Sequence, residues 1–237
     1  LEVGGKSVAG GKIKDGQPVN EDSADYLELS RNKTAFEEQG VESRLQNFSL
    51  LQVADGVSSS EDSAETSTLA IAQVREHVIH NLARLLELNP SDEMIEEVLS
   101  EAIQEAHEYL TETAVKEGKK IGTTLTLALV DRETNKAYYA HVGDSRAYVV
   151  TDRRIGSPKI DQITTDQTLG QHMRDLDQNP GSRADSILLG SIGKTDKQGQ
   201  PAKLDVQTGV VELGSNQKLL LCSDGLQTLA ESEIAQI

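Results

Sequence analysis

The sequence is poor in aromatic residues, in positive charge and in cysteine. Aromatic side chains make up 3% of the 237 residues and tryptophan is absent, which argues against a platform that stacks bases or sugar rings. Lys and Arg number 23 against 39 Asp and Glu, so the formal net charge is −16. This charge argues against nucleic acid as a partner, because its phosphates are bound mainly by Lys and Arg. It argues equally against binding to a membrane surface through basic residues.

Cysteine and long apolar runs are equally scarce. The single cysteine, Cys222, excludes an internal disulfide framework and a zinc site built from cysteines. It is compatible with a reducing compartment, and we expect the protein in the cytoplasm. No apolar run approaches the roughly 18 residues of a membrane-spanning helix, so we expect no membrane insertion.

The chain reads as one domain. Hydrophobic residues make up 36% of it, enough for a folded core. No Pro-, Gly- or Ser-rich linker and no internal repeat divides it, so we expect a single domain over residues 1–237 and a monomer. The chain begins at Leu1 and stops at Ile237, inside an expected helix. We therefore expect it to be truncated at the C-terminus.

Two segments have the apolar spacing of amphipathic helices, over residues 62–88 and 92–116. Between them Pro90 ends the first helix, and Ser91 is suited to cap the second, which Gly118 ends. The short segment between the two helices makes them antiparallel neighbours.

Strand patterns occupy most of the remainder. We expect residues 31–47 to form a loop, residues 152–187 to be irregular, and a helix to begin near residue 231. The three consecutive strands 123–130, 136–142 and 145–150 predict an antiparallel meander. Because strands and helices are grouped rather than alternating, the sequence predicts an α+β fold. The full set of expected strands is 24–30, 49–54, 123–130, 136–142, 145–150, 205–212 and 218–222.

Three aspartates follow apolar strand-like runs and stand beside glycines. Asp55 precedes Gly56, Asp224 precedes Gly225, and Asp144 follows Gly143. A single Asp–Gly pair is more often only a turn, so the residues alone leave a turn role and a metal site both open. Clustered carboxylates repel one another unless a cation lies among them. Ligands that are all oxygens favour Mg²⁺ or Mn²⁺ over zinc.

Beyond these aspartates, the ordered motifs resemble those of a known enzyme family. The match covers about residues 15–237 and is similar to the metal-dependent Ser/Thr protein phosphatases of the PPM type, also called type 2C, in their bacterial branch. The motifs are NEDS (20–23), VADGV (53–57), GTTLTLALV (122–130), HVGDSRAYVV (141–150), QITTDQT (162–168), LLGSIG (188–193) and LLLCSDGL (219–226).

The resemblance implies a fold and an activity. The fold is an α/β/β/α sandwich, in which two antiparallel sheets are flanked by antiparallel helix pairs. The activity is hydrolysis of phosphoserine and phosphothreonine in proteins, through a water that bridges two Mg²⁺ or Mn²⁺ ions, with a third ion in some relatives. The implied partners are phosphoproteins, among them a Ser/Thr kinase and its targets.

The resemblance also implies roles for particular residues. Asp55 matches the aspartate that bridges both metals, and Asp224 matches a ligand of the second metal, so both act in catalysis through metal-bound water. The remaining implied metal ligands are Gly56 through its carbonyl, Asp144 at the third metal, and Glu21 and Asp22 through metal-bound waters.

Two departures from the family pattern affect the expected activity. Gln17 stands where the family usually has an arginine that grips the substrate phosphate, and glutamine lacks the charged, two-pronged contact. The family's last motif, an Asp-Asn pair that supplies another metal ligand, does not appear before Ile237. These departures motivate an alternative function, that of an inactive pseudophosphatase that acts as a binding or regulatory module.

Overall fold

A computed structural model describes residues 13–14, 17–18, 20–37, 40–57, 62–86 and 90–228. The helix expected near residue 231 lies outside these residues, and so do residues 1–12. No helix in this part of the chain is long and apolar enough to cross a membrane.

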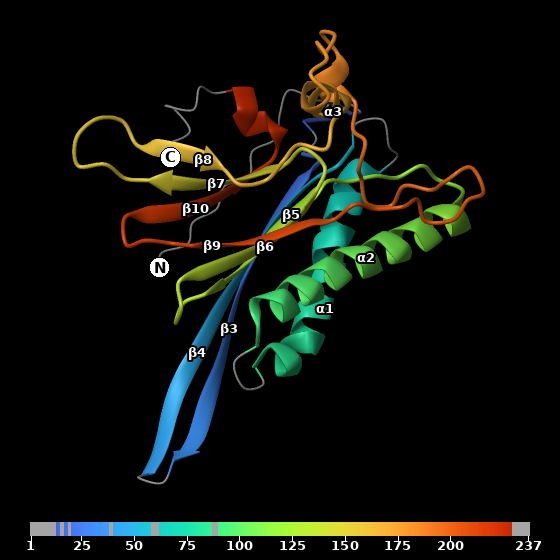
Figure 1. Cartoon of the computed structure of the whole chain (residues 1–237). Coiled ribbons are helices and arrows are strands. Elements are labelled where there is room, and N and C mark those ends of the chain that lie inside the picture. The colour runs from blue at the N-terminus through green and yellow to red at the C-terminus, as the bar shows by residue number, and fades with distance from the viewer. Residues whose placement is uncertain are drawn as a thin grey trace.

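Two antiparallel sheets form the body of the fold (Figure 1). The larger has the order β3-β4-β5-β6-β9, and the smaller has the order β10-β7-β8. A separate pair, β1 (Ile13–Lys14) and β2 (Gln17–Pro18), lies near the N-terminus. The strands of the two sheets are β3 (Asp22–Glu37), β4 (Gly40–Asp55), β5 (Leu125–Asp131), β6 (Lys136–Val142), β7 (Arg146–Thr151), β8 (Lys159–Gln162), β9 (Gln207–Glu212) and β10 (Gln217–Cys222).

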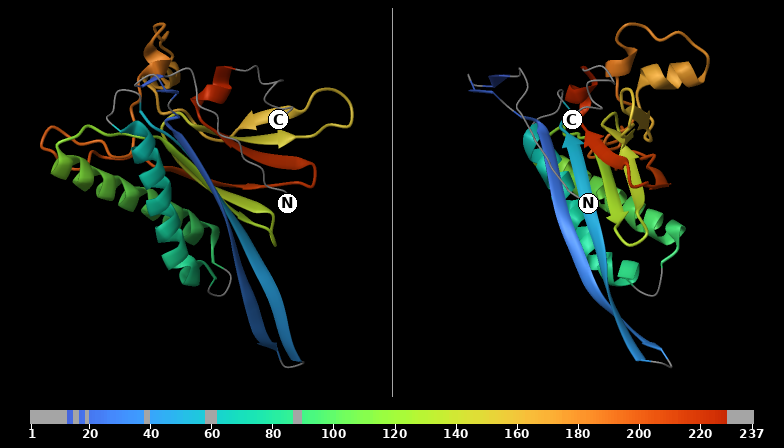
Figure 2. Two further views of the ribbon diagram at one scale, coloured as in Figure 1. Left: turned by 180° about the vertical axis from the view of Figure 1, so that it is seen from behind. Right: turned by 90° about the vertical axis from the view of Figure 1, so that its left-hand side faces the viewer.

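Two long helices cover one face of the five-stranded sheet (Figures 1 and 2). They are α1 (Ser63–Leu86) and α2 (Asp92–Glu117), and they confirm the helices expected at 62–88 and 92–116. The predicted cap is present, because the Ser91 hydroxyl accepts the Met94 N–H at 3.2 Å. Gly118 ends α2 at a φ of 67°, in the left-handed region that glycine adopts readily.

The main core lies between these helices and the five-stranded sheet. Fully buried apolar side chains from both layers meet there and remove the helix faces from water. A smaller core, formed by Val130, Ala137, Val149 and Leu213, joins the two sheets. The largest side chains of the main core include Phe48, Leu50, Leu85, Ile95, Leu99, Ile103, Leu110, Leu125, Leu127 and Leu129.

The predicted α+β class with two antiparallel sheets is confirmed. Among the described residues one antiparallel helix pair is present, where the resemblance implied two. The other helical pieces in this part of the chain are short: α3 (Leu169–Asp175) and single 3₁₀ turns at Ala184–Ser186 and Asp224–Thr228.

The segment expected to be a loop, residues 31–47, is instead β structure, so that prediction is wrong. β3 and β4 form one continuous hairpin, with pairs from Asp22↔Asp55 to Glu37↔Gly40. Residues 40–47 of β4 pair with β3 but not with β5. This outer part of the hairpin is a two-stranded ribbon that extends past the helices (Figure 1). A ribbon satisfies its own backbone hydrogen bonds without an apolar face, and the sequence pattern therefore gave no strand signal.

The predicted meander is correct for β5 and β6 and wrong for β7. β7 pairs with β8 and β10 in the smaller sheet, so the chain crosses from one sheet to the other between Val142 and Arg146. Gly143 makes this crossing at a φ of 110°. Its N–H and C=O bond to Gln167, through the Gln167 side chain at 3.1 Å and backbone at 2.7 Å, instead of closing a hairpin.

The segment expected to be irregular, residues 152–187, contains β8, α3 and a 3₁₀ turn, so that expectation is also wrong. These elements are short and mostly polar. β8 pairs with β7, and the Thr168 hydroxyl caps α3 by accepting the Gln171 N–H at 3.2 Å.

Candidate metal centre

Asp22 and Asp55 lie opposite each other at the open end of the β3–β4 hairpin. Asp22 is the first residue of β3, Asp55 is the last residue of β4, and the two are register partners. Directly opposite residues on paired strands have side chains on the same face, with Cβ atoms about 5 Å apart, and two like charges there repel each other. The hairpin therefore holds two carboxylates close together at one edge of the larger sheet.

Asp224 joins this pair from the smaller sheet. It begins the 3₁₀ turn that follows β10, and the preceding Ser223 hydroxyl donates to Asp22 Oδ2 at 3.0 Å. Burial, followed by the charges of Asp22 and Asp224, raises the pKa of Asp55 to about 9. The ends of the two sheets thus bring together aspartates that are far apart in the sequence.

Asp144 lies close enough to feel the same charges. It follows Gly143 in the crossing from β6 to β7. Burial raises the pKa of Asp144 to about 6, and the charges of Asp224 and Asp166 add to this effect. All three strand-end aspartates that the sequence singled out are therefore in one electrostatic cluster with Asp22.

Gly56 occupies a position that has no room for a side chain. A Cβ atom there would lie 2.4 Å from the Ser63 carbonyl oxygen, at the start of α1. The Gly56 N–H donates to the Glu21 carbonyl oxygen at 3.1 Å. The Glu21 carboxylate accepts a hydrogen bond from the Ser63 hydroxyl, so it is directed to the first turn of α1.

Two threonines, whose roles the sequence reasoning missed, fix the backbone of Asp55. The Thr124 hydroxyl accepts the Asp55 N–H at 3.0 Å. The Asp55 carbonyl accepts the Thr123 hydroxyl at 2.9 Å and the Thr124 N–H at 2.9 Å. Both threonines belong to the motif GTTLTLALV, which carried the family resemblance but showed no contact by itself. They hold the carboxylate-bearing residue on a rigid strand end.

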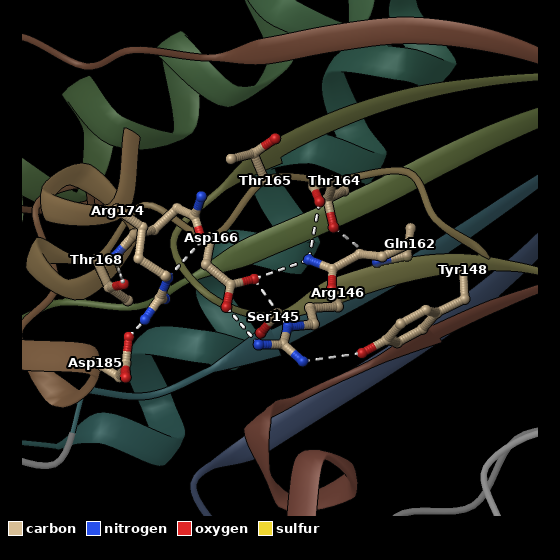
Figure 3. A network of polar contacts seen from close by, with 12 residues as sticks. Ser145, Arg146, Tyr148, Gln162, Thr164, Thr165, Asp166, Thr168, Arg174 and Asp185 are labelled. Carbon is tan, nitrogen blue, oxygen red and sulfur yellow. Dashed lines mark hydrogen bonds and ion pairs between the residues drawn. The ribbon is translucent and has the colours of Figure 1, made fainter. Parts of the chain in front are cut away.

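A second set of polar contacts lies just after Asp144 in the chain and is centred on Arg146 and Asp166 (Figure 3). Arg146 donates to both Asp166 oxygens, at 2.8 and 2.5 Å, and to the Tyr148 hydroxyl at 3.1 Å. Gln162 donates to Asp166 at 3.0 Å. This two-pronged arginine–carboxylate contact ties β7 to the segment that leads into α3. The sequence signal was only the adjacency of Arg146 to the Gly143–Asp144 turn.

The donor set fits a hard divalent cation. It consists of carboxylates at the ends of rigid strands, together with the backbone of Gly56, and such oxygen ligands suit Mg²⁺ and Mn²⁺. Burial first, and then the neighbouring carboxylates, raise the pKa values of Asp55 and Asp144, and a bound cation would favour the charged form of both. Within the described residues, no three acidic, His or Cys side chains are already spaced as ligands of one ion. The side chain of Gln17 lies outside the described residues.

Comparison with known proteins places this geometry in a family. Residues 39–235 match the family model of Protein phosphatase 2C. The "Serine/threonine phosphatase stp" of Listeria monocytogenes is 27% identical over 213 residues, which cover 84% of this chain and 75% of that protein. The "Protein phosphatase PhpP" of Streptococcus pneumoniae is 34% identical over 124 residues, which cover 49% of this chain and 45% of the relative.

Solved structures share the fold. The serine/threonine phosphatase PstP/Ppp of Mycobacterium tuberculosis superposes with a TM-score of 0.59 at 23% identity, covering 90% of this chain and 84% of that one. The catalytic domain of a PstP in complex with two manganese ions has a TM-score of 0.60 at 20% identity, covering 91% and 84%. The motif matches, the two-sheet architecture and the family match agree, and the chain belongs to the protein phosphatase 2C family of serine/threonine phosphatases.

Proposed function

We propose that this protein hydrolyses phosphoserine and phosphothreonine in protein substrates, using two or three Mg²⁺ or Mn²⁺ ions. One observation carries the proposal. Asp55, Asp22, Asp224 and Asp144 come from four different chain segments and converge at one end of the two sheets. A buried cluster of like charges is costly unless a cation compensates it. Divalent ions bound there would neutralise the phosphate and lower the pKa of a water molecule.

The individual roles follow from position. Asp55 is half-buried and lies close to both Asp22 and Asp224, so we assign it as the carboxylate that would contact two ions. Asp224 is exposed and would bind one ion from the solvent side, and Asp144 would bind a third. The Gly56 carbonyl adds a neutral oxygen ligand. Glu21 and Asp22 would hold metal-bound waters.

The other residues of the centre act by positioning. Thr123 and Thr124 fix the backbone of Asp55, and Ser223 fixes the carboxylate of Asp22. Since the missing side chain of Gly56 lets α1 approach, the helix start packs directly against the ligand-bearing turn. This scaffold keeps the carboxylates close despite their repulsion, so that the site is organised before an ion arrives.

The proposal extends to the setting in which the protein acts. We infer a single phosphatase domain that works as a monomer in the cytoplasm. Its substrates are phosphoproteins, and we expect a Ser/Thr kinase and the targets of that kinase among them. The acidic composition supports the exclusion of nucleic acid as a partner.

The test is hydrolysis of a phosphothreonine peptide as Mn²⁺ is added. We expect activity that depends on the metal and that falls about a hundredfold or more in Asp55→Asn and in Asp224→Asn, because each variant removes a charged ligand. Asp25→Asn is the matched control. Asp25 is also on β3, but it contacts Arg75 at 3.4 Å on the surface, and its variant should retain full activity.

Each failure has its own meaning. A wild-type chain with no metal-dependent turnover contradicts the enzymatic proposal and favours a binding module. Full activity in both Asp55→Asn and Asp224→Asn contradicts the assignment of the metal ligands while leaving the reaction in place.

A further inference from the structure

A pocket of about 520 Å³ lies beside the metal centre and has no part in the function proposed above. Its walls come from the segment after α2 and from residues 186–195. Lys119, Lys120 and Lys194 line it together with the hydroxyl-bearing Ser191 and Thr195. Three lysines around one pocket are unexpected in a chain with a net charge of −16.

The positive charge of the pocket comes mainly from two of these lysines. Lys119 contacts Asp62 and Glu117, each at 2.9 Å, so its charge is locally compensated. Lys120 and Lys194 are exposed and form no ion pair with another residue in the described part of the chain. Two uncompensated ammonium groups beside hydroxyl donors form a site for an anionic group.

The backbone beneath the two lysines is firmly held. Thr123 and Ile192 exchange backbone hydrogen bonds of 3.1 and 2.9 Å between the two walls. His107, buried on α2, accepts the Gly193 N–H at 3.0 Å and donates to the Ala202 carbonyl at 2.8 Å. Lys194 therefore lies between two points, Gly193 and Ala202, at which this segment is hydrogen-bonded to His107 of α2.

The pocket begins two residues from the central carboxylate. Val57, which follows Asp55 and Gly56 in the chain, lines the pocket. It donates its N–H to the Gly122 carbonyl at 2.9 Å. Two residues of chain span at most about 7 Å, so Val57 lies within that distance of Asp55. A substrate peptide with its phosphorylated residue at the metal centre would place a residue two or three positions away over the pocket.

We propose that this pocket binds an acidic side chain of the protein substrate, two or three residues from the phosphorylated residue. This inference rests on the proposed phosphatase function and adds a substrate class to it. Lys120 and Lys194 supply the attraction, and the Ser191 and Thr195 hydroxyls supply donors for the carboxylate oxygens. Elsewhere the acidic surface repels an acidic side chain of the substrate. The pocket therefore determines at which position of the substrate, relative to the phosphorylated residue, Glu or Asp is favoured.

The test compares phosphothreonine peptides that carry Glu or Gln at one position, two or three residues before or after the phosphothreonine. We expect kcat/KM of the wild-type protein to be about tenfold higher for Glu at one of these positions, since each exposed ion pair contributes about threefold. The double variant Lys120→Gln/Lys194→Gln should bring this ratio close to one. In Lys120→Glu/Lys194→Glu, a peptide with Lys at that position should become preferred.

Lys197→Gln is the matched control, because Lys197 is exposed in the same segment but does not line the pocket. It should keep the wild-type ratio. Comparing two peptides on one protein removes differences in folding or metal content. Equal kcat/KM for Glu and Gln at all four positions, or an equal loss of preference in Lys197→Gln, would overturn the proposal.

A second readout separates this inference from the reaction. If no peptide is hydrolysed, the proposed function fails, but fluorescence anisotropy still gives the affinity of each labelled peptide. A Glu-to-Gln affinity ratio that depends on Lys120 and Lys194 then supports the pocket by itself. A ratio of one in the wild type rejects it.

Discussion

For Asp55, the local sequence pattern predicts the chemistry of the side chain but not the residues around it. Its place after an apolar run and before Gly56 was sufficient to predict a carboxylate at a strand end. That Asp22 faces it across the hairpin follows only from the strand register. The contacts of Thr123 and Thr124 with the Asp55 backbone likewise depend on β5 lying beside β4. Residue type predicted the ligand chemistry, and long-range pairing supplied the neighbours.

His141 should make folding stability depend on pH. It is fully buried on β6, and burial lowers the pKa of its imidazole to about 4. Between this value and its unfolded pKa of about 6.5, the unfolded chain binds the extra proton, so stability falls as pH falls through that window. We expect His141 to account for a loss of about 3 kcal/mol between pH 7 and pH 4.

Urea unfolding of the metal-free protein at several pH values measures this loss. The comparison of interest is with His141→Gln, whose stability should change less over the same range. His80→Gln is the control, because His80 is exposed on α1 and should not alter the slope. Parallel curves for the wild type and His141→Gln would contradict the assignment.

Gln17 should limit the binding of the substrate phosphate. We expect Gln17→Arg to lower KM for a phosphothreonine peptide about tenfold, because a guanidinium makes charged, two-pronged hydrogen bonds to phosphate. Gln17→Lys adds the charge without the fork and should give a smaller gain. Steady-state kinetics of the three proteins decide the matter, and an unchanged KM in Gln17→Arg would show that this position does not contact the phosphate.

At the scale of elements, local signals predicted the helices well and the strands unevenly. α1 and α2 have apolar stripes, and α2 also has a capping serine and a terminal glycine, all of which are local in sequence. The outer half of the β3–β4 hairpin and the assignment of β7 to the smaller sheet were missed. Both depend on which strands pair, and pairing partners can lie far apart in the chain. Short polar elements such as β8 and α3 carry too few residues for a periodic pattern.

The crossing between the sheets should depend on Gly143. A Cβ atom there would lie 2.6 Å from Thr124 Cγ2, and the φ of 110° strains any other residue. We expect Gly143→Ala to destabilise the protein by about 2–4 kcal/mol, measured by urea unfolding. Gly181→Ala is the control, because no atom lies within 4 Å of its added methyl. Equal stability of the two variants would show that the crossing tolerates a side chain.

At the scale of the whole molecule, the acidic side chains fall into two groups. Among the residues that the structure describes, most carboxylates are exposed, and water and salt screen them. Asp22, Asp55, Asp144 and Asp224 form a cluster that the sequence predicted in part, through its strand-end aspartates. The cluster depends on two sheets packing so that their ends coincide, which no local pattern encodes. The metal-free protein therefore folds against the cost of burying these carboxylates next to one another.

Mn²⁺ should raise the thermal midpoint of unfolding of the wild-type protein, because a ligand that binds only the folded state stabilises it. Asp55→Asn should change stability in opposite directions with and without metal. Without Mn²⁺ it should be more stable than the wild type at pH 7 by about 4 kcal/mol. The pKa of Asp55 is raised to about 9 in the folded protein, so folding at pH 7 takes up a proton that asparagine does not need. With Mn²⁺ it should lose most of the upward shift.

Calorimetric melts of both proteins, with and without Mn²⁺, measure these changes. Asp25→Asn again provides the control and should behave like the wild type. A wild-type midpoint that does not move in millimolar Mn²⁺ would contradict the metal assignment. An Asp55→Asn protein that is less stable than the wild type without metal would contradict the claim that the Asp55 carboxylate destabilises the metal-free protein.

The long β3–β4 hairpin has a consequence for insertions and deletions. Because side chains alternate between faces, adding one residue within β3 turns the Asp22 side chain to the other face, and adding two moves it about 7 Å along the strand, past Asp55. Residues added between Glu37 and Gly40, at the closed end, leave every pair back to Asp22↔Asp55 unchanged. The hairpin can therefore vary in length at its tip without disturbing the metal centre, while a change in the length of one inner strand alone would separate Asp22 from Asp55.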